Sequence, residues 1–152
     1  MSRDRRHATA LVERIARVRE ARAKQQLSHA LAHEREQRLV VEASTDRLRS
    51  TERGLVALLA NERLDLLRAG LYQDLASAQQ IALENDKKVL KERAEARVDR
   101  ADELARKTHY RDKASHRARD AAVAYRLMEE GKEAGELIES WVLRQFRRVS
   151  LE

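Results

Sequence analysis

Histidines are the only side chains in this sequence whose spacing could build a metal or catalytic site. His29 and His33 stand four residues apart, a spacing that can chelate zinc from one face of a helix. A chain reversal near Gly70 would bring His109 close to them. However, no carboxylate lies between the two imidazoles, and histidines on the helices of an arginine-rich chain usually face solvent. We therefore expect no bound metal and no cofactor.

Motifs for other chemistry are missing from the chain. It has no cysteine, which excludes thiolate chemistry, and its four scattered glycines form neither a nucleophile elbow nor a phosphate-binding loop. Most carboxylates have arginine or lysine at helical spacing, which is typical of a solvated face crossed by weak ion pairs. We expect a protein that is not an enzyme.

The elements that carry these residues should be helices almost throughout. The 152 residues include no proline, 38% are charged, and only 3% are aromatic. The hydrophobic residues include 24 alanines and 20 leucines, so the large apolar side chains are too few for a thick core. We expect packing along a thin seam between close helices, or against a partner.

Charge divides the chain into two highly charged flanks and an apolar middle. Residues 54–85 carry only six charged side chains, whereas the flanks carry the rest. Each flank has a 4-3 spacing that predicts a coiled coil with a poor core. The predicted seam of the first flank consists of Leu11, Ile15, Val18, Arg22, Gln25, His29, Ala32, Glu36, Leu39 and Ala43. The predicted seam of the second flank consists of Leu90, Ala94, Arg97, Ala101, Leu104, Thr108, Arg111, Ser115, Ala118, Ala122 and Tyr125.

The favoured fold is all-α, a long antiparallel two-helix coiled-coil hairpin with a C-terminal amphipathic helical extension. A turn near Gly70 would pair an arm at 8–68 with an arm at 72–132, leaving the amphipathic segment 134–149 without an opposite arm. Gly131 and Gly135 mark a weak point before that segment. A single long helix that dimerises and a three-helix bundle with breaks near 54 and 85 are the alternatives.

Two apolar surfaces are candidates for partner binding. In the middle of the chain, we expect Leu71, Tyr72 and Leu75 to face outward as a docking surface, while other leucines pack on each other. Near the C-terminus, Ile138, Trp141 and Val142 either pack back onto Leu11 and Ile15 or anchor a partner.

The organisation of the chain resembles the FliJ/YscO family of type III secretion and flagellar export stalk proteins. The resemblance rests on the basic residues 3–6 leading into Leu11, Ile15 and Val18, on Leu71-Tyr-Gln-Asp-Leu75, and on residues 132–144. It implies a two-helix coiled coil similar to the rotor stalk of F-type ATP synthases. The terminal end, with Leu11, Ile15, Val18, Ile138, Trp141 and Val142, would bind the hexameric export ATPase.

The same resemblance implies that the surface around Leu71, Tyr72 and Leu75 contacts the export-gate protein or secretion chaperones. The protein would then be cytoplasmic and peripheral to the inner-membrane secretion apparatus, which agrees with the lack of an apolar run of about 20 residues. A sequence pI near 10.0 supports a rival hypothesis, a basic helical nucleic-acid-binding protein. A structural coiled-coil scaffold is the third hypothesis.

Overall fold

The computed structural model describes residues 3–60 and 65–149, and the regular elements in these ranges are two helices. Helix α1 covers Arg3–Leu59 and helix α2 covers Leu66–Val149. The two helices pack against each other, which confirms the predicted all-helical class. Alanine, leucine, arginine and glutamate all favour helix, and no proline interrupts either element.

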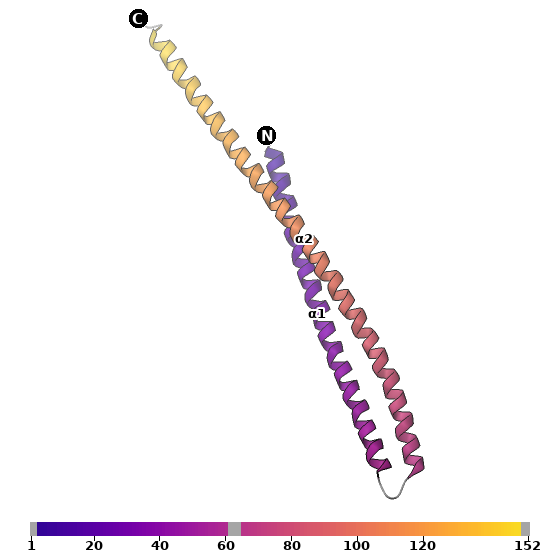
Figure 1. The fold of residues 1–152 in the computed structure, drawn as a ribbon. Helices are drawn as coiled ribbons and strands as arrows, with labels where there is room; N and C mark the ends of the chain where they lie inside the picture. The colour runs from indigo at the N-terminus through magenta and orange to yellow at the C-terminus, as the bar shows by residue number, and fades with distance from the viewer. Residues whose placement is uncertain (1–2, 61–64, 150–152) are drawn as a thin grey trace. The chain divides into compact units, whose positions relative to one another are not determined.

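The chain forms two compact units, each made from one stretch of α1 and one stretch of α2. The first unit comprises Met1–Arg22 and Ala105–Glu152, and the second comprises Ala23–Leu104. In the second unit the two stretches lie side by side and run antiparallel (Figure 1). The first unit is antiparallel too, since Arg6 lies over the ring of Tyr125 while Glu20 meets Arg111.

The break between the helices lies earlier in the chain than predicted. Gly70 is inside α2, so the predicted turn at this residue is wrong. Helix α2 begins instead behind Asp65, whose Oδ1 accepts a hydrogen bond of 3.1 Å from the backbone N–H of Arg68. This is an N-cap, which satisfies an amide left unpaired at the start of a helix. A lone glycine costs only about 1 kcal/mol relative to alanine inside a helix, so Gly70 does not end one.

The earlier break changes which residues face each other. A turn centred on Gly70 would place Glu34 opposite Arg106, but in the structure Glu34 pairs with Arg97, nine residues earlier in α2. Of the predicted arm 8–68, residues 61–64 lie outside the described residues, and residues 66–68 belong to α2. Gly54 and Asn85 lie within helices, so the three-helix arrangement is not the one observed.

The face of α1 that packs against α2 is not the predicted one. All ten residues of the predicted first seam, from Leu11 to Ala43, are exposed. Most of the buried and half-buried positions of α1 follow another series, also at alternating intervals of four and three. This series consists of Thr9, Glu13, Ala16, Glu20, Ala23, Leu27, Ala30, Glu34, Gln37, Val41, Ser44, Leu48, Thr51, Leu55 and Leu58. Each residue of the predicted seam lies two positions after a residue of this series, which is about 200° around a helix of 3.6 residues per turn.

The predicted seam of α2 is nearly correct. Its residues are half-buried except for Ala101 and Ala122, which are exposed. Across both units, the buried side chains of the seam are small or polar. The fully buried apolar residues are Ala16, Ala23, Leu83, Ala114 and Ala121, and the fully buried polar ones are Glu20, Glu34, Gln37, Ser44 and Thr51. Leu83 is the one large apolar side chain among these ten.

The C-terminal part of α2 continues without a boundary at either glycine. Gly131 and Gly135 are helical, and a Cβ added at either position would meet nothing within 4 Å. The predicted weak point before the segment 134–149 is therefore not a helix boundary. Because both glycines face open space, no neighbouring group forces the backbone out of the helix there.

Candidate partner-binding surfaces

The N-terminal apolar face, defined by Leu11, Ile15 and Val18, is turned away from the seam. These side chains are 59%, 43% and 50% exposed, whereas Ala16 beside them is 1% exposed. In the first unit, Ala16 and Glu20 are buried in the seam between α1 and α2. The three large side chains do not contribute to this seam. Exposed apolar side chains gathered at helical spacing are typical of a contact surface.

The C-terminal apolar face, defined by Leu137, Ile138, Trp141 and Val142, is exposed as well. Trp141 is 61% exposed and Leu137 is 68% exposed. Tryptophan is the residue most enriched at binding hot spots, because it buries a large area and carries one hydrogen-bond donor. This face is a candidate anchor for another helix.

The structure does not bring the N-terminal and C-terminal apolar faces together. Arg6 lies 5.0 Å from the centroid of the Tyr125 ring, which fixes the level of α1 along α2 in this unit. Leu11 is five residues from Arg6 in one direction, and Trp141 is sixteen residues from Tyr125 in the other. At 1.5 Å per residue the two faces are roughly 30 Å apart. Of the two alternatives for Trp141, the structure does not show the one in which it packs back onto Leu11 and Ile15.

The mid-chain surface is only partly as predicted. Leu71 and Leu75 are exposed, as expected, but Tyr72 is half-buried and turns toward α1. A Cβ added to Gly54 would lie 2.8 Å from Cε1 of Tyr72, so the ring occupies the space that this glycine leaves free. The exposed residues Leu66 and Leu67, which the sequence reasoning missed as surface residues, extend the surface toward the start of α2.

A charged cluster in the second unit fixes α1 against α2. The carboxylate of Glu34, whose side chain is 5% exposed, lies 2.6 Å from Nη2 of Arg38 and 2.8 Å from Nε of Arg97. Ten residues further along α1, Ser44 donates a hydrogen bond of 2.7 Å to Oδ2 of Asp86. Buried charges are tolerated only when they are paired, so these contacts set the register of the two helices.

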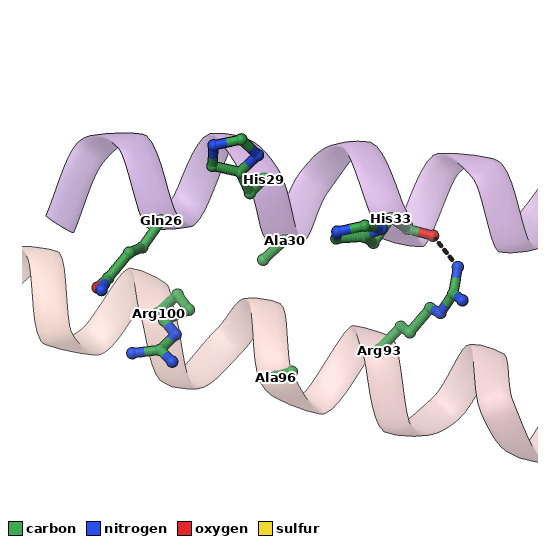
Figure 2. Close-up of a pocket in the computed structure, with 7 residues that line it drawn as sticks. All are labelled: Gln26, His29, Ala30, His33, Arg93, Ala96 and Arg100. Atoms are coloured by element: carbon green, nitrogen blue, oxygen red, sulfur yellow. Dashed lines mark hydrogen bonds between the residues drawn. The ribbon is translucent and has the colours of Figure 1, made fainter. Parts of the chain in front are cut away.

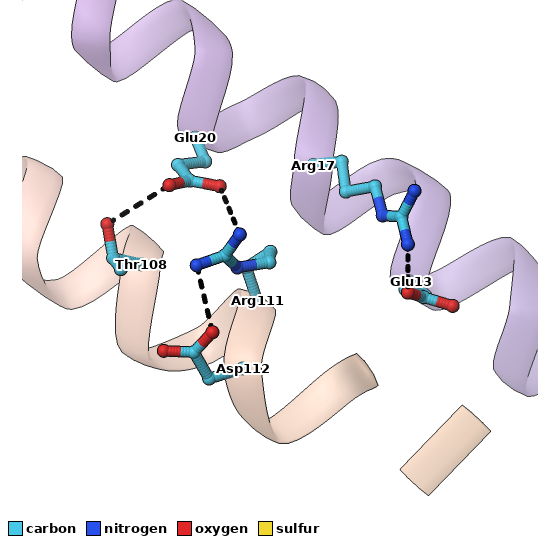
Figure 3. Close-up of polar contacts among 6 residues, drawn as sticks. All are labelled: Glu13, Arg17, Glu20, Thr108, Arg111 and Asp112. Carbon is cyan, nitrogen blue, oxygen red and sulfur yellow. Dashed lines mark hydrogen bonds and ion pairs between the residues drawn. The ribbon is translucent and has the colours of Figure 1, made fainter. Parts of the chain in front are cut away.

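A matching cluster occurs in the first unit. The hydroxyl of Thr108 donates to Oε1 of Glu20 at 3.4 Å, and Nη1 of Arg111 lies 3.5 Å from Oε2 of the same carboxylate (Figure 3). Arg111 also pairs with Asp112 at 2.9 Å. Glu20 and Glu34 are fourteen residues apart in α1, and Arg97 and Arg111 are fourteen residues apart in α2. That equal spacing is the signal in the sequence by which these pairs could have been found.

The pKa of the Glu13 carboxyl group is shifted by its neighbours. Its pKa is lowered from 4.5, mainly because Nη2 of Arg17 donates a hydrogen bond of 2.6 Å to the carboxylate. Partial desolvation opposes this effect, while a hydrogen bond from Ser115 of α2 supports it. The charged form of Glu13 therefore helps to hold the first unit.

The groove near His29 and His33 is lined by cationic and neutral side chains. The groove is lined by Gln26, His29, Ala30 and His33 of α1 and by Arg93, Ala96 and Arg100 of α2. In Figure 2 the side chain of Gln26 extends toward α2, whereas the ring of His29 lies at the edge of α1 that is away from α2. Nη1 of Arg93 donates to the backbone oxygen of His33 at 2.9 Å, and Nη1 of Arg100 donates to Glu103 at 2.8 Å. Two guanidinium groups beside the imidazoles oppose the binding of a metal cation.

The third histidine that the sequence suggested does not belong to this groove. His109 is in the first unit, whereas His29 and His33 are in the second. Among the side chains that the structure describes, no three His, Cys, Asp or Glu residues gather in a way that could hold a metal ion. Neither helix, over the described ranges, contains a stretch apolar enough to cross a membrane.

Comparison of the chain with family models, with curated proteins and with solved structures finds no match.

Proposed function

We propose that this chain is a non-enzymatic stalk or adaptor of a bacterial type III secretion or flagellar export apparatus, similar in role to the FliJ/YscO family. The observation that supports this role best is which side chains pack within the protein and which are exposed. Most of the buried side chains of the seam are alanine or polar residues, while many large apolar side chains are exposed. A protein that leaves many of its leucines and its one tryptophan outside its own packing is suited to binding partners through them.

The form of the stalk in this proposal is a long antiparallel two-helix coiled coil with an amphipathic C-terminal extension. The alternating intervals of three and four between buried positions support a coiled coil, because they keep one face of each helix toward the other. The exposed side chains of the C-terminal apolar face support the extension, since α1 supplies no counterpart at the level of Trp141 within the described residues.

The two terminal faces would bind the hexameric export ATPase, and Leu71 and Leu75 would bind the export-gate protein or secretion chaperones. Because the N-terminal and C-terminal apolar faces are about 30 Å apart along the first unit, the ATPase would contact them at separate places. The protein would work in the cytoplasm, at the periphery of the inner-membrane apparatus.

The test is co-purification with the export ATPase of the same cell, followed by measurement of ATP turnover and ring assembly. We expect the chain to raise both, and Trp141→Ala to weaken the effect at least about fivefold, the cost of removing an aromatic anchor. Val123→Ala is the matched control, because Val123 is an exposed apolar residue of α2 outside the proposed faces. An ATPase that does not respond to the chain, or that responds equally to both variants, contradicts the proposal.

A further inference from the structure

The C-terminal segment of α2 has its charges separated along its length. Residues 129–139 contain five glutamates and one lysine, whereas residues 144–148 contain three arginines and no acid. The C-terminal apolar face begins within the acidic stretch and ends before the basic one, and its residues Ile138 and Trp141 are exposed. One half of the segment is therefore acidic and the other half is basic.

We propose that this segment binds the same segment of a second copy of the chain, with the two helices antiparallel. A parallel pairing would set five glutamates against five glutamates, which is destabilising. An antiparallel pairing instead sets the acidic half of each copy against the basic half of the other. The occupant of the exposed face is thus specified by charge complementarity, because the segment is complementary to itself.

The apolar residues fit the same arrangement. Ile138 and Trp141 are three residues apart on one face, so an antiparallel pair centred between residues 139 and 140 places Ile138 of each copy opposite Trp141 of the other. In this register Glu133 of one copy lies within about 3 Å, measured along the axis, of the level of Arg144 in the other. Glu133 and Arg144 are exposed, and both lie on the same side of the apolar face.

The space around the helix allows the approach of another helix. Nothing lies within 4 Å of a Cβ built at Gly131 or Gly135, so the glycine side of the segment is open. A contact about 16 residues long extends about 24 Å, which gives an interface at the small end of specific ones. An interface of this size suits a weak, reversible pair.

This self-association does not require a role in secretion, and its test is independent of the export ATPase. Sedimentation velocity of the full chain over a range of concentrations should show a reversible monomer–dimer equilibrium. Trp141→Ala should weaken the dimer roughly tenfold, and Val123→Ala should leave it unchanged. Circular dichroism of each variant confirms that its helix content is intact. A chain that stays monomeric, or a dimer that tolerates Trp141→Ala, overturns the proposal.

The charge pairing has its own test. Glu133→Arg and Arg144→Glu should each weaken the dimer severalfold, because each places like charges together, and the double variant should recover the affinity of the original chain. Failure of the double variant to recover overturns the proposed register.

The orientation of the two copies can be measured because the chain contains no cysteine. Spin labels on Ser140→Cys should lie close together in the dimer, while labels on Glu130→Cys should be separated by about 3 Å for each residue from the midpoint, or roughly 30 Å. Equal short distances at both positions would show a parallel pair and overturn the proposal.

Discussion

Removal of Glu34 is the most informative perturbation of the seam. Its carboxylate is held by Arg38 of the same helix and by Arg97 of α2, and Nε of Arg97 is buried. Breaking a fully buried pair by deleting one partner costs about 3–5 kcal/mol. The side chains of Arg38 and Arg97 are 63% and 40% exposed, so water can solvate part of the charge that is left behind. For Glu34→Ala we therefore expect a loss of about 1–2 kcal/mol in the free energy of unfolding.

The measurement is urea unfolding at neutral pH, followed by far-UV circular dichroism. Glu36→Ala is the matched control, since the side chain of Glu36 is 69% exposed and lies 3.7 Å from Arg93. A surface pair of this kind is worth less than about 1 kcal/mol. The double variant Glu34→Leu with Arg97→Leu should be as stable as the original chain or more so, because it replaces a buried ion pair by an apolar contact.

Two results would refute this reasoning. If Glu34→Ala and Glu36→Ala cost the same, burial of the carboxylate does not control the seam. If Glu34→Ala, Arg97→Ala and their combination are simply additive, the two side chains do not stabilise each other despite the distance of 2.8 Å between them.

Other substitutions test the glycines and the acid response. Gly70→Ala should raise the free energy of unfolding by about 1 kcal/mol, because the site is helical and open, whereas Gly54→Ala should gain less, since Tyr72 must first move aside. Equal gains in urea unfolding would show that the Tyr72 contact carries no cost. Because the pKa of Glu13 is lowered in the folded chain, its charged form stabilises the fold at pH values above 4.5. This stabilisation is lost as the pH falls through the lowered pKa of the folded chain. Glu13→Gln should therefore flatten the acid side of the stability–pH curve, and an unchanged slope would contradict the contact with Arg17.

The helical class could be predicted because it depends on local preference. Alanine, leucine, arginine and glutamate favour helix at almost any position, and the absence of proline leaves little to interrupt it. The position of the break was harder to predict, since glycine and asparagine occur at several places in the middle of the chain. The decisive residue was Asp65, whose side chain caps α2 ahead of two leucines. That signal is present in the sequence, but the predicted turn rested on Gly70 alone.

The packing face of α1 could not be predicted from α1 by itself. Leu11, Ile15 and Val18 have the spacing of a buried stripe, and burying them would remove more apolar surface from water than burying Ala16 and Glu20. Which face packs is decided by the side chains on the other helix. The candidate surfaces were predicted only in part. Leu71, Leu75 and Trp141 are exposed as expected, whereas Tyr72 is half-buried and turned toward α1.

The arginines of α2 explain why the polar face of α1 is the one that packs. The seam of α2 includes Arg93, Arg97 and Arg111, each about one-third to two-fifths exposed. If the face with Leu11, Ile15 and Val18 covered them, these guanidinium groups would lose water without gaining an anion, at a cost of several kcal/mol each when buried. The face with Glu20 and Glu34 supplies the anions at the same fourteen-residue spacing. Pairing those charges leaves Leu11, Ile15 and Val18 outside the seam, so the electrostatics of the seam determine which apolar side chains remain free to bind a partner.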